Sequence, residues 1–513
     1  MDTYQSYAEY YHELTKYTPE GIASNQHRLD FAKQPPLFKE YPTAKNIDLS
    51  YLLPLDRNPF SDAGIKNPKD YSKEEKHLAP LSQILYLANG VTAIIPYADS
   101  PFYMRAAPSA GGLYPTEIYV LASSFPGLKD GIYNYQVKKH SLALIKEGDF
   151  KNQIQHACFD HPILQESNLL LIATGVFVRS SWRYQDRAYR RICLDTGHVI
   201  GNINLASYFY GYKAYNIGGF IDSAINSLLE LDEEEEQSLA IIPLLPKDQE
   251  TADVTHPRCL PSRLDSDNLR TPEGYRLIEL HNRSKIEKSV PVPDIKFENV
   301  EEKFILSPKL PFETYWKNAN WKGTLIPTIL KRRSTRAFTG EPIAKERLGW
   351  ILDFAYNGNL FKESRIDPNP TYLDTSIIQT FIAVNNVTGL EEGCYYYSSL
   401  GRYLRQVRFK NFREDIYYLC LGQDLGYQAS AVIFHTCDLS RAVFKYGERA
   451  YRYLHLDAGH IGQRINLAAI NLQLGVSGIG GFFDNQVNEL LGIPEHEVVI
   501  YITVLGVPAQ TNN

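Results

Sequence analysis

The sequence predicts a mixed α+β protein in which one structural unit occurs twice along the same chain. The first observation is a long internal repeat. Adding 262 to any position from 131 to 229 gives its counterpart without a gap, and residues 183–206 match residues 445–468 at 13 of 24 positions. A period of this length indicates a duplicated domain with its own core rather than a solenoid. The other two observations are strands and helices mixed within each copy, and one long apolar helix per copy.

The elements follow the same order in both copies. TEIYVLAS and QTFIAVNN alternate as half-buried strands, and GIYNYQ and GCYYYS are second short strands that run towards hairpins. LLLIATGVF and SAVIFHTC are continuous apolar runs, which predict buried strands. The long helix lies in the repeated stretch 183–206 or 445–468, and IGGF, a short helix and a last strand such as EVVIYITVLG follow it. Each unit is therefore a mostly antiparallel sheet flanked by helices.

The duplicated long helix predicts how the two units meet. Helices related by a two-fold axis pack well against each other, so we expect a pseudo-two-fold dimer within one chain, with these helices at its centre. His198 and His460, and likewise Asp195 and Asp457, recur at matching positions of the helix. Buried interface residues are the more common meaning of such positions, so none of the four is placed in the active site.

We divide the chain into four regions. Residues 1–80 are an N-terminal extension that could dock a peptide, residues 81–246 the first copy, 247–320 a polar, proline-bearing linker, and 321–510 the second copy. The acidic run at 232–236 is interpreted as a solvated loop before the last strand of the first copy.

Composition excludes several classes of function. The chain has 513 residues, 44% apolar and 22% charged, which is typical of a soluble globular protein. A net charge of -6 gives no overall positive field, so neither nucleic acid nor an anionic membrane is an expected partner. The six cysteines lack the spacing of a metal site or a disulfide framework, and no signal peptide or membrane span is recognisable. We therefore expect a cytoplasmic protein without a bound metal.

The two copies differ where a ligand would lie. Before its first strand, the first copy carries small residues at 108–112 (PSAGG), which let the backbone approach a flat ligand closely, whereas the second copy has bulky Tyr372, Leu373 and Asp374 nearby. The second copy instead carries a cluster of arginines and hydroxyls at 332–336 (RRSTR), which suits a phosphate. One half thus keeps a small-residue wall and the other keeps a cationic cluster. This predicts one composite site between the halves and one flavin-sized ligand per chain.

These motifs, together with KYGERAYRYLHLDAGHIGQ and IGGFFDNQVNELLG, resemble the nitroreductase-like flavoproteins, and more narrowly the SagB/ThcOx-type dehydrogenases that include the cyanobactin thiazoline oxidases. The resemblance spans most of residues 10–508 apart from the linker. It implies two fused nitroreductase-like domains with FMN at their interface.

The resemblance also implies roles for individual residues. Arg332, Arg333 and Ser334 would hold the phosphate or ribityl groups, and Arg336 would approach the N1/O2 edge of the ring. The ring would be lined by Pro108, Ser109, Ala110, Gly111 and Gly112 from the first copy, with Gly480 and Gly481 passing its N5 side. Relatives often have a further basic pair near the C-terminus; because LGVPAQTNN has none, phosphate binding depends more heavily on Arg332 and Arg333.

The family's lysine-tyrosine pair corresponds to Lys445 and Tyr446, whereas the first copy has Arg183 and Tyr184. Lysine can lose its proton when it is desolvated, and arginine essentially cannot, so Lys445 with Tyr446 is the predicted catalytic pair. The predicted activity is FMN-dependent oxidation of azolines in a ribosomally made peptide to azoles, with molecular oxygen as electron acceptor.

Two other functions stay open at this point. One is an NAD(P)H-dependent reductase of quinones or nitro compounds, which would use the same pocket in the opposite direction. The other is a non-catalytic partner in a peptide-modifying complex. The sequence also leaves open whether the fused pair forms a homodimer.

Overall fold

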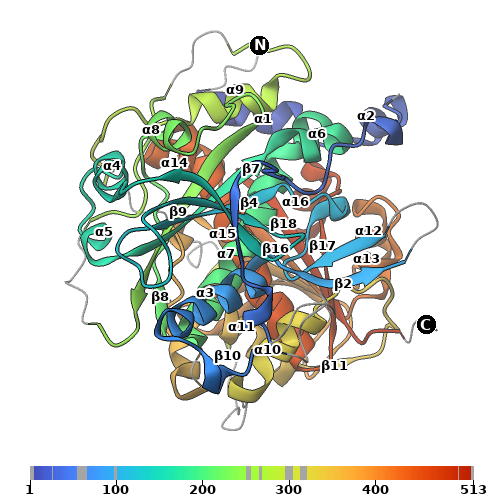
Figure 1. Cartoon of the computed structure of the whole chain (residues 1–513). Helices are drawn as coiled ribbons and strands as arrows, with labels where there is room; N and C mark the ends of the chain where they lie inside the picture. Colours follow the sequence, from blue (N-terminus) through green and yellow to red (C-terminus); the bar gives the residue numbers. More distant parts are fainter. Residues whose placement is uncertain are drawn as a thin grey trace.

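Two seven-stranded sheets, antiparallel throughout, contain most of the strands in this computed structural model (Figure 1). The structure describes residues 5–25, 27–54, 66–96, 101–249, 256–264, 269–294, 304–311, 321–364, 366–494 and 496–509. The first sheet has the order β1 (Lys45–Asp48), β6 (Ser141–Glu147), β5 (Gly131–Gln136), β4 (Thr116–Ala122), β7 (Leu169–Val176), β9 (Glu236–Pro246) and β8 (Tyr212–Ala214). The second repeats it with β10 (Leu310–Pro311), β15 (Tyr403–Arg408), β14 (Gly393–Ser398), β12 (Gln379–Val384), β16 (Ala431–Asp438), β18 (Glu497–Gly506) and β17 (Gly475–Ile479). The predicted α+β class and the repeat are confirmed.

Smaller elements complete the two halves. β2 (Val91–Ile95) and β3 (Phe102–Arg105) form an antiparallel hairpin, and β11 (Ile343–Ala344) pairs in parallel with β13 (Val387–Thr388). The helices of the first half are α1 (Tyr7–Leu14), α2 (Pro19–Ser24), α3 (Lys73–Asn89), α4 (Lys151–Ala157), α5 (Ile163–Glu166), α6 (Phe177–Tyr184), α7 (Ala188–Phe209) and α8 (Asp222–Leu228). Those that follow are α9 (Arg276–Arg283), α10 (Trp321–Lys331), α11 (Lys345–Tyr356), α12 (Arg413–Leu419), α13 (Asp424–Gln428), α14 (Leu439–Tyr446), α15 (Ala450–Asn471) and α16 (Asp484–Leu491).

The central strands are buried on both faces, which corrects the expectation of half-buried strands. All seven residues of β4 are buried. Ile118 and Val120 belong to the core that includes residues of α3 and α7, whereas Tyr119 and Leu121 belong to a second core with residues of α4 and α8. Because successive side chains of a strand point to opposite faces, helices cover both sides of the sheet. The continuous apolar run from Ile118 to Ala122 fits a strand that is buried on both faces.

The long helices α7 and α15 cross in the middle of the molecule (Figure 1). A Cβ atom at Gly197 would lie 2.1 Å from the carbonyl oxygen of Leu456, and one at Gly459 would lie 2.2 Å from that of Leu194. Only glycine therefore permits this backbone contact. Gly197 and Gly459 are counterparts in the repeat, so their contact marks the pseudo-two-fold axis. Each long helix begins later than predicted, at Ala188 and Ala450, because a residue with positive φ interrupts the repeated stretch in each copy (Gln185, φ 50°; Gly447, φ 63°).

Two buried ion-pair networks join the halves on either side of this axis. Arg187 and Arg190 of the first half donate to the carboxylate of Asp484 at 2.8 and 2.7 Å. Burial alone would raise the pKa of Asp484, yet the two guanidinium groups hold it below its usual value. The counterparts Arg449 and Arg452 donate in the same way to Asp222 of the first half. Each half therefore supplies the anion for the other half's arginines.

The repeat also extends beyond the predicted boundaries. Glu448 accepts hydrogen bonds from the first backbone amides of α1, and its counterpart Asp186 accepts them at the start of α9. His12 bonds to Tyr451 and His281 bonds to Tyr189, again as counterparts. The α1 region of the N-terminal extension and the α9 region of the linker are therefore equivalent parts of the two units, each packed across the interface.

The acidic run at 232–236 divides into two parts. Asp232, Glu234 and Glu235 are exposed in a turn, as expected, but Glu236 opens β9 and is buried. Its carboxylate pairs with Lys39 at 2.5 Å and accepts a hydrogen bond from Thr174. The last residue of the run is thus a core ion-pair partner rather than a solvated charge.

Candidate functional site

A cavity of about 690 Å³ lies between the two halves. From the first half it is lined by Ile95, Phe102, Met104, Pro108, Ser109, Ala110, Gly111, Gly112, Tyr114, Arg183, Arg191, Leu194, Asp195 and His198. From the second half it is lined by Arg332, Arg333, Ser334, Arg336, Asn466, Ser477, Gly478, Gly480 and Tyr501. The small-residue wall and the arginine cluster, which are far apart in the sequence, thus face one shared space.

Asp195 of α7 holds the small-residue wall in place. Its carboxylate accepts a hydrogen bond from the Ser109 hydroxyl at 2.6 Å and one from the backbone amide of Ala110. Burial raises the pKa of Asp195 to about 7, although these hydrogen bonds act in the opposite direction. Gly111 and Gly112 follow with φ of 65° and 67°, a conformation that favours glycine. A Cβ atom at Gly111 would lie 2.8 Å from the Tyr184 hydroxyl, so the backbone and that side chain meet closely at the cavity wall.

The cationic cluster follows the end of α10. Arg332 is buried, and its guanidinium donates to the carbonyl oxygens of Ala106 (2.7 Å) and Arg105 (3.2 Å) of the first half. Burial lowers the pKa of Arg332 to about 10. Arg333 donates to the hydroxyl of Thr92, also in the first half, at 3.2 Å. These contacts hold the cluster directly against the segment that leads into the small-residue wall.

Other cluster members have unused hydrogen-bonding capacity. The side chains of Ser334 and Arg336 make no hydrogen bond or ion pair within the part of the chain that the structure describes, and Arg336 is exposed at the cavity. On another side, Arg191 donates to the carbonyl of Gly480 at 3.1 Å and lies 3.9 Å above the ring of Tyr184. Its buried Nη1 atom has no partner among the described residues. An anionic, polar ligand could satisfy these donors.

The structure does not bring the predicted catalytic pair to this cavity. The ammonium of Lys445 pairs with Asp374 at 2.7 Å, and the Tyr446 hydroxyl donates to the same carboxylate oxygen. Neither residue lines the cavity, and neither does Gly481. The reason is the pseudo-symmetry: α14 of the second half faces the second half's own segment 372–374, just as α6 of the first half faces the small-residue wall. Arg183 of the α6 pair lines the cavity instead, with Tyr184 against its glycine wall.

Sequence reasoning missed several residues of the cavity. His198 is buried as expected, but it also lines the cavity and contacts the Tyr501 hydroxyl through Nε2 at 3.2 Å. Burial lowers the pKa of His198 to about 4, so the ring is neutral at physiological pH. Asp195 likewise lines the cavity, although it was interpreted only as an interface residue. The sequence contained a signal for Tyr501, because this tyrosine interrupts a last strand, residues 498–505, that is otherwise aliphatic apart from Thr503.

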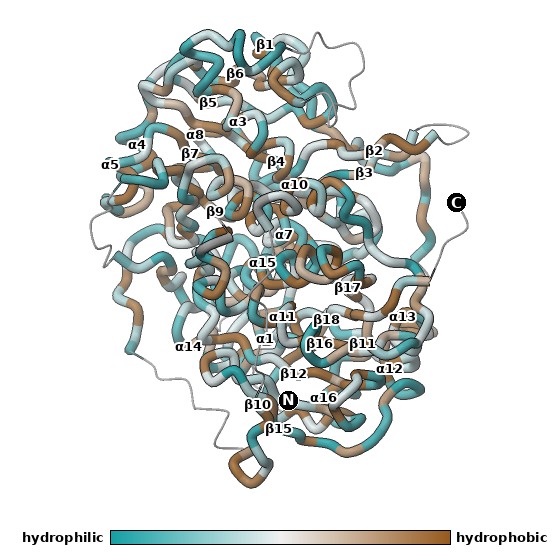
Figure 2. Tube along the Cα trace, turned by 90° about the horizontal axis from the view of Figure 1, so that it is seen from below, coloured by the Kyte–Doolittle hydropathy of each residue, from teal (hydrophilic) through white to brown (hydrophobic). Residues whose placement is uncertain are grey.

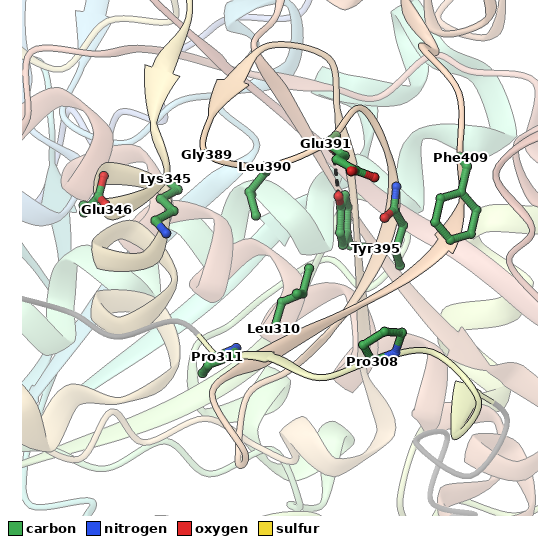
Figure 3. A pocket seen from close by; sticks show the side chains of 11 residues that line it. Pro308, Leu310, Pro311, Lys345, Glu346, Gly389, Leu390, Glu391, Tyr395 and Phe409 are labelled. Carbon is green, nitrogen blue, oxygen red and sulfur yellow. Dashed lines mark hydrogen bonds between the residues drawn. The ribbon is translucent and has the colours of Figure 1, made fainter.

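A second cavity, of about 730 Å³, lies entirely within the second half (Figure 3). Leu310 of β10, Leu390 and Tyr395 line it, and the Tyr395 hydroxyl donates to the backbone carbonyl of Glu391 at 2.8 Å. Its lining is mostly apolar and includes neither the arginine cluster nor the small-residue wall. Although it is slightly larger, its lining contains a single cationic side chain, Lys345, beside the carboxylates Glu346 and Glu391, and no arginine.

The described residues contain neither a candidate metal site nor a candidate membrane-spanning helix. No group of three or more histidine, cysteine, aspartate or glutamate side chains among them is arranged to hold a metal ion. None of the helices in the described ranges combines the length and the apolar character needed to cross a membrane.

Comparison with known proteins identifies the class. The nitroreductase family model matches residues 69–244 and again 329–507, so the chain belongs to the nitroreductase family and carries its domain twice. A putative nitroreductase from Anabaena variabilis ATCC 29413 has a similar crystal structure, with 46% sequence identity, a TM-score of 0.89 and coverage of 99% of this chain and 100% of that one. The protein is therefore a nitroreductase-like oxidoreductase with two fused domains.

Curated relatives match one part of the chain each. The putative nitroreductase MJ1384 of Methanocaldococcus jannaschii is 28% identical over 176 residues, which is 34% of this chain and 88% of that protein. The trifolitoxin-processing protein TfxB of Rhizobium leguminosarum bv. trifolii is 28% identical over 203 residues, 36% of this chain. The match spans about half (52%) of TfxB.

Proposed function

We propose that the protein is an FMN-dependent oxidase that converts azolines, such as thiazolines or oxazolines, in a ribosomally made peptide to azoles. The observation that carries the proposal is the single cavity in which the arginine cluster of one half faces the small-residue wall of the other. Its volume of about 690 Å³ is in the range of cofactor sites, which are commonly about 300–1,000 Å³. The similarity to a trifolitoxin-processing protein supports a substrate that is processed during maturation.

The residues present fit FMN. Arg332, Arg333 and Ser334 would hold its phosphate, because planar guanidinium groups and hydroxyls bind phosphate oxygens well. The unpartnered Nη1 of Arg191 is a buried donor that a polar ring edge would satisfy, and Arg336 would add positive charge to the same cavity. Residues 108–112 would accommodate a flat ring because their side chains are small or absent.

When bound, FMN supplies the two-electron chemistry of the site. The proposed reaction removes two hydrogens from the azoline ring, one as a hydride and one as the Cα proton, and molecular oxygen takes up both and becomes hydrogen peroxide. Arg191 and Arg336 stabilise negative charge that develops in the cavity. His198 and Tyr501 are a neutral, hydrogen-bonded pair in the cavity lining. The assignment of the Cα proton to Lys445 and Tyr446 stays a prediction from the resemblance, because both lie outside the cavity.

The first experiment is an absorption spectrum of the purified protein, followed by mass identification and stoichiometry of the released ligand. One FMN per chain is expected, and two would contradict a composite site. Incubation of the flavin-loaded protein with a synthetic thiazoline peptide in air should remove two hydrogens, as measured by mass spectrometry. Rapid bleaching by NADPH without azoline oxidation would identify a reductase instead, and a protein that binds no flavin would fit a non-catalytic partner.

A variant tests the cationic cluster. Arg336→Gln should weaken FMN binding by about tenfold to a hundredfold, since a hydrogen bond to a charged group contributes about 1.5–3 kcal/mol. The matched control is Arg441→Gln on α14, outside the cavity, which should leave the dissociation constant unchanged. Equal FMN affinity of the wild type and Arg336→Gln would remove Arg336 from the proposed site.

A further inference from the structure

The β2–β3 hairpin carries an exposed group of large apolar side chains at the cavity. Ile94, Ile95 and Phe102 are 43%, 44% and 43% exposed. Ile95, Phe102 and Met104 also line the cavity between the halves. The hairpin stands at the edge of the molecule in both views (Figures 1 and 2). Clustered apolar side chains that are exposed at the mouth of a cavity are typical of a binding surface rather than of a solvated loop.

The base of this hairpin is fixed to the site. The Thr92 hydroxyl accepts a hydrogen bond from Arg333 of the cationic cluster, and the backbone amide of Ala106 donates to the carbonyl of Gly90 at 3.0 Å. Phe102 lies against the glycine wall, because a Cβ atom at Gly112 would be 3.3 Å from its Cζ atom. The apolar side chains are therefore held in a defined position beside the wall that would line the ring.

Among the described residues of the second half, no hairpin stands at the matching place. Between α11 and β12 these residues form the 3-10 segments Gly358–Ser364 and Thr375–Ile377 and no strand. The hairpin is therefore a feature of the half that supplies the small-residue wall, and it is absent beside the bulky segment 372–374. A structural need shared by both units does not explain it.

We propose that the β2–β3 hairpin binds an aliphatic or aromatic side chain of the peptide substrate, next to the ring that reacts. This inference rests on the proposed function. A ring within a peptide continues as chain on both sides, so the residues that flank it must leave the cavity past its rim. On the hairpin side the rim is apolar, through Ile95 and Phe102, whereas Arg183 at another part of the rim is charged and exposed. An apolar neighbour on the hairpin side would remove exposed apolar surface of both partners from water.

The test compares two synthetic thiazoline hexapeptides, with leucine or serine next to the ring, on the flavin-loaded full chain. We expect the wild type to prefer the leucine peptide in kcat/KM. Phe102→Ser should lower kcat/KM for that peptide about tenfold, mainly through KM, and lower it for the serine peptide by a much smaller factor, so the preference for leucine is lost. Rates are expressed per bound flavin, because Phe102 also lines the cavity, and Leu400→Ser, at a residue that is 97% exposed in the other half, is the control.

The outcomes separate the two proposals. A wild type that oxidises both peptides equally, with Phe102→Ser unaltered, overturns the hairpin assignment and leaves the proposed function standing. A wild type that oxidises neither peptide but binds the leucine peptide more tightly in calorimetry, with the preference lost in Phe102→Ser, contradicts the proposed function and supports the hairpin. Dimerisation in light scattering that Phe102→Ser abolishes would assign the apolar group to a second copy of the chain and overturn the inference.

Discussion

The composite cavity and its pseudo-symmetric counterpart share a frame but differ in what fills them. At the cavity, residues 108–112 and Arg191 line open space. At the counterpart, Tyr372 packs on His460 with ring centroids 4.4 Å apart. The linker segment 258–262 also passes there: the amides of Gly218 and Gly219 donate to the Arg258 carbonyl, and the Ser262 amide donates to the Tyr446 carbonyl. The chain itself occupies the space that a second ligand would need.

The comparison explains why an anchoring carboxylate is present at both sites, Asp195 at the cavity and Asp457 at its counterpart. Asp195 binds the wall at Ser109 and Ala110, and Asp457 accepts hydrogen bonds from the amides of Leu373 and Asp374 in the same manner. Both sites therefore keep the same supporting structure, here called the frame, which consists of the anchoring carboxylate and the buried arginine-aspartate pairs. Open space for a ligand is kept at one of them. Residues common to both sites serve folding, and residues present at one site are the candidates for chemistry.

The largest expected effect concerns the shared frame. Asp484→Ala leaves Arg187 and Arg190 buried without their carboxylate, which should lower the free energy of unfolding by about 3–5 kcal/mol. Asp222→Ala should cost a similar amount through Arg449 and Arg452. Urea titration of both variants measures this. Asp415→Ala, in the partly exposed pair with Lys410, is the control and should cost under about 1 kcal/mol. A large difference between Asp484→Ala and Asp222→Ala would contradict a common frame.

The sequence predicted the fold and the composite arrangement well because both depend on repeated patterns. The repeat determined two similar units, and the contrast between residues 108–112 and 332–336 indicated the shared cavity. Burial of the strands was predicted less well, because short runs such as residues 116–123 do not by themselves show whether helices cover one face of the sheet or both. The equivalence of α1 and α9 was not seen, since apart from His12 and His281 the two helices have few residues in common.

The lysine-tyrosine pair, whose catalytic role stays a prediction, lies outside the composite cavity for a different reason. A resemblance assigns Lys445 and Tyr446 to a family position, but in a fused pair each such position occurs twice. Which occurrence faces the open cavity depends on how the halves pack around Gly197 and Gly459. Helix spacing within one unit contains no information about that packing.

The next largest effect is the pH dependence of stability that the anchoring carboxylate of Asp195 causes. The pKa of Asp195 is about 7 in the folded protein and about 4 when unfolded, so folding takes up a proton between these values. Stability of the ligand-free wild type should therefore fall as the pH rises from about 4 to 7, by at most about 4 kcal/mol from this group. Asp195→Asn keeps an acceptor but cannot titrate, so its stability relative to the wild type should rise over that window. Urea titrations at several pH values test this, and a constant difference between the two proteins would refute it. Asp457→Asn should behave alike.

A smaller effect distinguishes the cavity wall from an ordinary turn. Gly111→Ala and Gly211→Ala both place a side chain at positive φ, which should cost each about 1 kcal/mol of stability. A Cβ atom at Gly211 meets nothing within 4 Å, whereas at Gly111 it meets the Tyr184 hydroxyl. Gly111→Ala should therefore displace Tyr184 and weaken FMN binding about tenfold, and Gly211→Ala should not. Fluorescence titration measures the FMN affinity of both variants. Equal affinities of Gly111→Ala and Gly211→Ala would show that the wall does not contact the ligand.

The smallest effect is expected at the filled site. Lys445→Ala removes one partner of Asp374, whose carboxylate still accepts hydrogen bonds from Tyr446 and Ser376. If the chemistry is confined to the composite cavity, azoline oxidation should change less than about twofold, because Lys445 lies outside it, whereas the assignment from the resemblance expects loss of turnover. Tyr184→Phe, at the counterpart of Tyr446, should lower the rate more. Loss of turnover in Lys445→Ala with unchanged flavin content and unchanged unfolding would support the assignment of the Cα proton to Lys445.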